Sequence, residues 1–195
     1  MFTEAIQERI IEHQTVTHHL WNDTKFCENI SEIIAVLTHC FKSGGKLLIC
    51  GNGGSAADSQ HIATELVSKF FLERKAIDAE ALTVNTSTLT AIGNDYDFDT
   101  VFSRQVEAKG RNGDVLLSLS TSGNSKNVIK AMKAAKKRKM ITIGFTGNVF
   151  PNLMWELSNY LVSIPSDSTP RVQEAHILIG HIICELVEKN LFEGE

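Results

Sequence analysis

His61 and Glu65 lie four residues apart in the stretch SQHIATELVSKF. In a helix this spacing places both side chains on one face, beside an apolar stripe of Ile62, Leu66 and Phe70. An imidazole and a carboxylate so placed can bind a divalent metal ion, or can set a general base beside a polarising imidazole. The alternative is a solvated helix pair without a chemical role. The position of the pair favours chemistry, because it follows a glycine turn at the end of a predicted strand.

A second set of candidate ligands lies near the C-terminus, in RVQEAHILIGHIICELVEK. Its members are Gln173, Glu174, His176 and His181. Glu174 and His181 are seven residues apart and share one helix face. Gln173 and His176 are three apart and can share another. One of the two histidines is expected on the apolar core stripe of the same helix, but the spacing does not choose between them.

The glycine turn GNGGSA matches the dinucleotide-binding pattern G-x-G-x-x-A at Gly51, Gly53 and Ala56. That pattern also requires an acidic residue at the end of the second strand, to bind the ribose. The second predicted strand ends at Asn85 instead, and Glu80 precedes it. The sequence therefore disfavours a nicotinamide enzyme. The turn is better suited to a sugar, or its phosphate, lying against the backbone.

The loop STSGNS is a candidate phosphate site. It offers four hydroxyl groups, those of Ser120, Thr121, Ser122 and Ser125, and Gly123 allows a tight turn. The predicted helix over residues 124–139 points its positive end at the loop, which favours an anion. The loop contains no Lys or Arg, and the GxxxxGK[ST] pattern of a P-loop is absent. The alternative is a serine-rich helix cap without a ligand.

Alternating strands and helices must position these residues. Continuous apolar runs predict five strands, at residues 46–50, 81–85, 114–120, 140–146 and 160–164. Such runs are typical of strands buried on both faces, so we predict a parallel sheet covered by helices, an α/β fold. Helical spacing over residues 3–43, with a polar break near Asn22 and Asp23, predicts an N-terminal helical extension, and a final helix runs from Thr169 to Asn190. Ligands of such sheets bind at the carboxyl ends of the strands, where Asn94 and Asp95 also follow the second strand.

Composition limits the class of protein. The chain has 195 residues, 43% of them hydrophobic, which fits one globular domain. Its net charge of −4 and its lack of a basic block make a nucleic-acid partner unlikely. The cysteines have no CxxC spacing and read as reduced core thiols; they are Cys27, Cys40, Cys50 and Cys184. No membrane span or secretory signal is recognisable, so we expect no membrane partner and a cytoplasmic location.

Five motifs together carry a resemblance that runs nearly end to end: CGNGGSAADSQH, AIGNDY, FSRQVEA, GDVLLSLSTSGNS and RVQEAHILIGH. As a set they resemble the phosphoheptose isomerase family of the sugar-isomerase (SIS) domain group. The resemblance implies a single SIS domain over residues 1–195, with a five-stranded parallel sheet in a three-layer fold. It also implies a homotetramer in which the N-terminal helices, residues 1–43, contribute to the interfaces, and one Zn2+ per subunit.

The resemblance also implies roles for individual residues. The implied zinc ligands are His61, Glu65, Gln173 and His181, which leaves His176 for the core. The implied catalytic pair is Glu65 as base and His181 as acid. The implied substrate contacts are Asn52, Gly53, Gly54, Ser55, Glu65, Asn94, Asp95, Ser120, Thr121, Ser122, Ser125 and Gln173.

The sequence departs from the family pattern at three places. Ser68-Lys69 stands where many members have Gly-Arg, which keeps a positive charge but loses the bidentate reach of a guanidinium. The segment TGNVFPN, residues 146–152, replaces a glycine-rich loop, and Pro170 replaces an aspartate. These differences bear on loop shape and on contacts to sugar hydroxyls, and they leave the implied metal ligands intact.

The implied reaction is an aldose–ketose isomerisation of D-sedoheptulose 7-phosphate to D-glycero-D-manno-heptose 7-phosphate through an enediol, the first step toward ADP-heptose for the lipopolysaccharide core. One alternative is a non-catalytic SIS-domain regulator that binds the bacterial replication initiator. Such a regulator does not need Glu65 together with His181, and this chain has both. A sugar-phosphate-sensing module of a DNA-binding protein is disfavoured, because the chain is acidic and shows no helix-turn-helix pattern.

Overall fold

A computed structural model describes residues 2–193 of the chain. Its centre is a five-stranded parallel sheet in the order β2-β1-β3-β4-β5. The strands are β1 (Leu47–Cys50), β2 (Ala79–Ala81), β3 (Val115–Leu119), β4 (Ile141–Thr146) and β5 (Tyr160–Ser163). The central strands β1 and β3 are buried on both faces, as their largely apolar sequences predict; Ser118 is the one polar residue in them.

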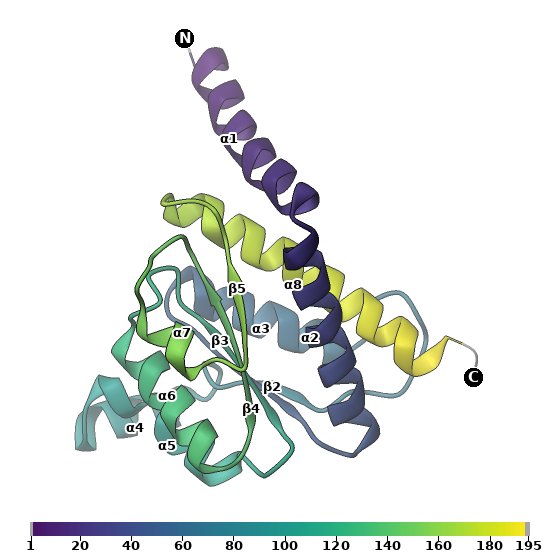
Figure 1. Ribbon diagram of the computed structural model, residues 1–195. Helices are drawn as coiled ribbons and strands as arrows, with labels where there is room; N and C mark the ends of the chain where they lie inside the picture. The colour runs from purple at the N-terminus through teal and green to yellow at the C-terminus, as the bar shows by residue number, and fades with distance from the viewer. Residues whose placement is uncertain (1, 194–195) are drawn as a thin grey trace.

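Helices cover both faces of the sheet (Figure 1). One layer contains α2 (Thr24–Lys42), α3 (Gly54–Val67) and α8 (Thr169–Phe192). The other contains α5 (Ser103–Lys109), α6 (Lys126–Lys137) and α7 (Leu153–Leu157), with α4 (Thr86–Asp95) and a short 3-10 helix (Phe98–Thr100) at its edge. The predicted three-layer α/β fold is therefore confirmed.

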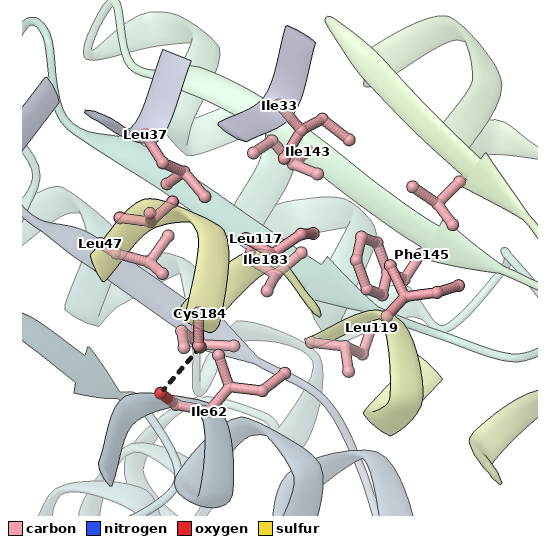
Figure 2. Packing of buried hydrophobic residues seen from close by; sticks show 14 of the residues in the cluster. Ile33, Leu37, Leu47, Ile62, Leu117, Leu119, Ile143, Phe145, Ile183 and Cys184 are labelled. Carbon is pink, nitrogen blue, oxygen red and sulfur yellow. Dashed lines mark hydrogen bonds between the residues drawn. The ribbon is translucent and has the colours of Figure 1, made fainter. Parts of the chain in front are cut away.

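The layer that carries the candidate ligands packs tightly on the sheet. Figure 2 shows Leu37 of α2 and Ile183 of α8 packed with Leu117 of β3 in one buried cluster. At the α3–α8 contact, a Cβ atom on Gly180 would lie 2.8 Å from Cδ1 of Ile62. The side chain of Ile62 thus packs directly on the backbone of α8 at Gly180, where a larger residue would not fit; this contact limits how closely the helices approach but leaves their sliding to other contacts.

The N-terminal extension is two helices, α1 (Thr3–Asn22) and α2, and the predicted break between them is confirmed. Asp23 caps α2 by accepting a hydrogen bond from the backbone N–H of Phe26 at 3.1 Å. α1 projects away from the body of the domain (Figure 1). Only Val16 and Leu20 of α1 are buried, so most of this helix finds no apolar cover within one chain.

The prediction for the second strand was wrong in position. β2 covers Ala79–Ala81 rather than residues 81–85, and Asn85 instead caps α4, accepting a hydrogen bond from the first turn of that helix at 2.9 Å. Glu80 therefore lies inside the strand, not before it, and its carboxylate pairs with Lys109. β2 is a three-residue edge strand, so its apolar pattern is weak. The more apolar run at residues 81–85, which begins at the last residue of β2, therefore led to the wrong prediction. Across residues 2–193, no helix combines the length and the apolar character that a membrane crossing needs.

Candidate functional site

The strand order reverses between β1 and β3. From β1 the chain moves outward to β2, and from β3 it moves the other way to β4 and β5. A reversal of this kind opens a crevice at the carboxyl ends of the two adjacent strands, where ligands of doubly wound sheets bind. The glycine turn, residues 51–54, leaves β1 at this point, and the serine loop, residues 120–125, leaves β3 beside it. The two candidate anion-binding segments are thus neighbours.

A pair of amides joins the two segments. Asn52 donates to Oδ1 of Asn127 at 2.9 Å, and Asn127 donates back to Oδ1 of Asn52 at 2.8 Å. Asn127 is buried in the first turn of α6, and its oxygen also accepts the backbone N–H of Val128 at 2.9 Å. Sequence reasoning missed Asn127, although a polar residue on the buried face of a predicted helix was the available signal. The pairing occupies one donor and one acceptor of Asn52, a predicted substrate contact.

The glycine turn makes room for the C-terminal helix. Gly53 has φ +58°, a conformation that favours glycine, and immediately precedes α3. A Cβ atom on Gly54 would lie 2.6 Å from Nε2 of Gln173, so the side chain of Gln173 occupies the space that glycine leaves. Ser55 is buried behind the turn, and its carbonyl accepts the hydroxyl of Ser59 at 2.7 Å.

Three predicted ligands come together across the α3–α8 contact. Nε2 of His61 lies 3.1 Å from Oε1 of Glu65 and 2.9 Å from Nε2 of His181. One donor atom from each residue lies within 4.8 Å of the other two. Gln173 precedes His181 by about two turns of α8, and its neighbour Gly54 precedes His61 by about two turns of α3. Gln173 therefore lies along the same helix contact, with its amide against Gly54.

The donor set fits a divalent metal ion. Two imidazole nitrogens and a carboxylate oxygen are ligands that Zn2+ takes in tetrahedral sites, with a fourth position for a further group. His61 is half exposed and Glu65 is partly buried, so an ion and a substrate can reach them from solvent. Because the two Nε2 atoms are only 2.9 Å apart, the imidazoles of His61 and His181 direct these nitrogens toward one point.

The other histidine of α8 lies in the core, as expected. His176 is fully buried, its ring lies 5.4 Å from that of Phe145, and its Nε2 is 3.3 Å from the carbonyl oxygen of Thr146. Burial lowers its pKa to about 4, with the Thr146 contact acting in the opposite direction. A neutral, enclosed imidazole of this kind is a structural residue.

The serine loop gathers hydroxyl groups at the start of α6. Ser120 donates to Ser125 at 3.0 Å and lies 3.4 Å from the hydroxyl of Ser122. Ser125 holds the N-cap position, yet its side chain makes no capping hydrogen bond, which leaves the helix end open to an anion. Gly123 has φ +65°, and the side chain of Asn152 packs against it from the divergent segment. That segment therefore supports the loop.

Other predicted residues lie apart from the three-donor cluster. Asn94 and Asp95 are exposed at the end of α4 and hydrogen-bond to each other at 2.9 Å. Among the described residues, no hydrogen bond or ion pair joins them to the cluster of His61, Glu65 and His181. Lys69 is exposed and pairs with Glu73 at 2.5 Å, so its charge is directed along the surface.

Two neighbours of the cluster were not predicted. The ring of Phe70 lies 5.8 Å from that of His181 and limits the space on one side of the imidazole. Asp58 lies one turn before His61; burial raises the pKa of its carboxyl, and His61 acts in the opposite direction. The spacing of Asp58 and His61 in one helix was a usable signal, whereas Phe70 lies beyond the end of α3, and its contact depends on how the segment after α3 packs against α8.

Comparison with known proteins gives the family. The SIS domain family matches residues 16–147. The phosphoheptose isomerase of Clostridium acetobutylicum is 56% identical over 173 residues, covering 87% of this chain and 86% of that protein. That of Nitratiruptor sp. is 47% identical over 187 residues, covering 96% and 98%.

Solved structures agree. The phosphoheptose isomerase GmhA from Neisseria gonorrhoeae superposes with a TM-score of 0.90 at 41% identity, covering 97% of this chain and all of that one. The enzyme from Francisella tularensis gives 0.91 at 31% identity, covering 97% and 99%. With a matching domain, near-complete coverage and identity well above 30%, this chain belongs to the phosphoheptose isomerase family of SIS-domain proteins.

Proposed function

We propose that this protein is a phosphoheptose isomerase that converts D-sedoheptulose 7-phosphate to D-glycero-D-manno-heptose 7-phosphate, the first step toward ADP-heptose for the lipopolysaccharide core. One observation carries the proposal: His61 and Glu65 of α3 meet His181 of α8 within 4.8 Å, in a chain of this family. An imidazole–carboxylate cluster, together with two loops suited to an anion, has the parts that an aldose–ketose isomerisation needs.

The metal is proposed to be one Zn2+ per subunit, held by His61, Glu65 and His181 with Gln173 as the fourth ligand. The nitrogen and oxygen donors of the cluster support zinc over magnesium, which prefers oxygen ligands. When bound, such an ion polarises the substrate carbonyl and stabilises negative charge on its oxygen. Gln173 lies along the same α3–α8 contact, with its amide against Gly54, and this position is the one proposed to serve the site.

The phosphate is proposed to bind at the serine loop. The hydroxyls of Ser122 and Ser125 both lie within 3.4 Å of the hydroxyl of Ser120, at the open start of α6. Hydroxyl donors and free backbone N–H groups at a helix N-terminus suit a dianion without requiring a lysine. Thr121 belongs to the same loop. The reacting carbons then extend from the serine loop toward α3, along the glycine turn at Asn52, Gly53 and Gly54.

The proton transfers are assigned to two residues. The carboxylate of Glu65 takes the proton from C1 of the ketose, and the C1–H electron pair forms the C1=C2 bond of the enediol while O2 gains a proton. Glu65 then returns its proton to C2, and O1 loses its proton as the aldehyde forms. His181 is the group that gives the proton to O2 and accepts the proton from O1; because an atom bound to Zn2+ cannot hold the proton, Glu65 and His181 are each assigned to act through their other oxygen or nitrogen. No atom is gained or lost overall, and each transfer is general acid–base catalysis.

A homotetramer with a cytoplasmic location is proposed as its working state. The projecting helix α1 and its N-cap residue expose apolar side chains, those of Phe2, Ile6, Ile10 and Ile11. A groove of about 370 Å3 between α2 and α8 is lined by apolar residues that include Ile30, Ile34, Ile179 and Ile182. Exposed apolar side chains beside an apolar groove support burial between subunits. Light scattering coupled to size-exclusion chromatography measures the mass directly, and a monomer at micromolar concentration contradicts this part.

The decisive experiment is an isomerase assay with sedoheptulose 7-phosphate. The reaction is followed by 1H NMR in D2O, in which a proton exchanged at C2 of the product appears as lost signal intensity. Parent protein is assayed as purified, after exhaustive chelation, and after Zn2+ is restored. We expect turnover, its loss on chelation and its recovery with zinc. Full activity after complete metal removal contradicts the metal assignment, and absence of turnover with bound sugar phosphate favours a non-catalytic regulator.

A further inference from the structure

A buried ion pair lies beyond the cluster, at the far end of the α3–α8 contact. Nε of Arg74 lies 2.8 Å from Oε1 of Glu188, and both side chains are 1% exposed. We propose that Arg74 and Glu188 are positioning residues, which hold α3 against α8 so that His61, Glu65 and His181 face one point. The inference rests on the proposed metal function of that cluster. Neither residue is among the expected ligands or substrate contacts.

Arg74 holds the end of the helix that carries Glu65. Its guanidinium donates to the carbonyl oxygens of Glu65 at 2.9 Å, Leu66 at 2.7 Å and Ser68 at 3.0 Å. Glu65 and Leu66 lie in the last turn of α3, whose carbonyls have no partners within their own helix, and Ser68 is its C-cap residue. One of the three carbonyls belongs to the backbone of Glu65 itself. The planar fork of arginine spans several acceptors at once, which a lysine cannot do.

Glu188 holds the segment that follows α3. It accepts the backbone N–H groups of Phe70 at 2.9 Å, Phe71 at 2.7 Å and Leu72 at 2.9 Å. Burial alone raises the pKa of this carboxyl, but the three N–H donors and Arg74 outweigh it and hold the pKa below its usual value. The group is therefore an ionised carboxylate with four charge-assisted hydrogen bonds, a rigid anchor.

The anchor acts on both sides of the cluster. Glu188 follows His181 by seven residues, two turns along the same face of α8. Phe70, whose backbone it fixes, packs its ring 5.8 Å from the ring of His181. Apolar contacts such as Ile62 against Gly180 set how far apart the helices are, but they resist sliding weakly. The hydrogen bonds of Arg74 and Glu188 join α3, the segment after it and α8. Because hydrogen bonds are directional, they fix the position of α3 along α8 and hence where the donor atoms of the cluster meet.

The test measures Zn2+ affinity, not activity alone. Arg74→Lys keeps the charge beside Glu188 but loses the fork, and Glu188→Gln keeps the shape but loses the charge. The control is Asp114→Asn. Asp114 is also a buried carboxylate, paired with Lys46 at 2.6 Å and bonded to two backbone N–H groups, but it lies at the amino end of β3, away from the site. Apo proteins are titrated with Zn2+ against a chromophoric chelator, at a temperature where circular dichroism shows each variant folded.

We expect both site variants to bind Zn2+ about 10–100-fold more weakly than the parent, the loss usual for second-sphere partners of a metal site. Asp114→Asn should bind within about twofold of the parent. Parent-like zinc affinity in Arg74→Lys overturns the inference, even if Glu188→Gln does not fold. Equal weakening in the control also overturns it, because the loss then reflects general destabilisation. A parent that binds no zinc refutes the proposed metal function instead, so the two failures are distinguishable.

Discussion

Replacing Gly54 with alanine should leave the fold intact and remove most of the activity. Gly54 is the first residue of α3 and has no positive φ, so alanine suits its backbone. Alanine is favoured over glycine in helices by about 0.5–1 kcal/mol. For a chain of this length, that gain raises the melting temperature by up to about 4 °C.

The added methyl group nevertheless cannot coexist with Gln173 as it stands. The new Cβ would lie 2.6 Å from Nε2 and 2.8 Å from Oε1 of Gln173, well inside ordinary contact. The amide must move by about 1 Å, and a displacement of that size at a reacting centre costs about 100-fold in rate. We therefore expect kcat/KM to fall about 100-fold while stability is unchanged or higher.

The assay combines calorimetry with isomerase kinetics. Gly93→Ala is the matched control for stability, because Gly93 lies inside α4 and a Cβ there meets nothing within 4 Å. Both variants should gain stability from helix propensity. Only Gly54→Ala should lose activity, because only there does the new methyl group displace the amide of Gln173. Parent-like kcat/KM in Gly54→Ala would refute the reasoning, as would a large fall in its melting temperature.

Three further outcomes are expected. Glu65→Gln should fold and bind inorganic phosphate normally, with turnover about 10²–10⁴-fold lower; near-parent turnover places the base elsewhere. Ser122→Ala combined with Ser125→Ala should raise KM more than it lowers kcat, by roughly 1–3 kcal/mol in all, and should weaken competitive inhibition by phosphate; an effect on kcat alone argues against a phosphate site there. The pKa of His176 is about 4 in the folded protein and near 6.5 in the unfolded chain. Between these pH values the imidazole is protonated only in the unfolded chain, so the free energy of unfolding falls as the pH drops from 6.5 to 4. Urea unfolding of the metal-free protein should show His176→Leu losing roughly 3 kcal/mol of that pH dependence, and equal slopes for parent and variant contradict the assignment.

Features set by local backbone geometry could be predicted from the sequence. His61 and Glu65 share a face because four residues nearly complete a helical turn, whatever surrounds the helix. Four of the five strands lie where apolar runs indicated them, and for the inner strands β1, β3 and β4 the reason is burial on both faces, which leaves no polar alternation. The break at Asp23 follows equally from its capping side chain. The implied ligand Gln173 came from resemblance, not from spacing.

Tertiary structure decided whatever depends on how distant segments meet. His176 and His181 are on one helix, and only the packing of α8 on the sheet buries the first and turns the second toward His61. Arg74 and Glu188 are 114 residues apart, so no local pattern marks them as partners. Side-chain spacing within a helix is fixed by hydrogen bonds of its own backbone, whereas its rotation and register against a neighbour depend on contacts that the whole fold must first assemble.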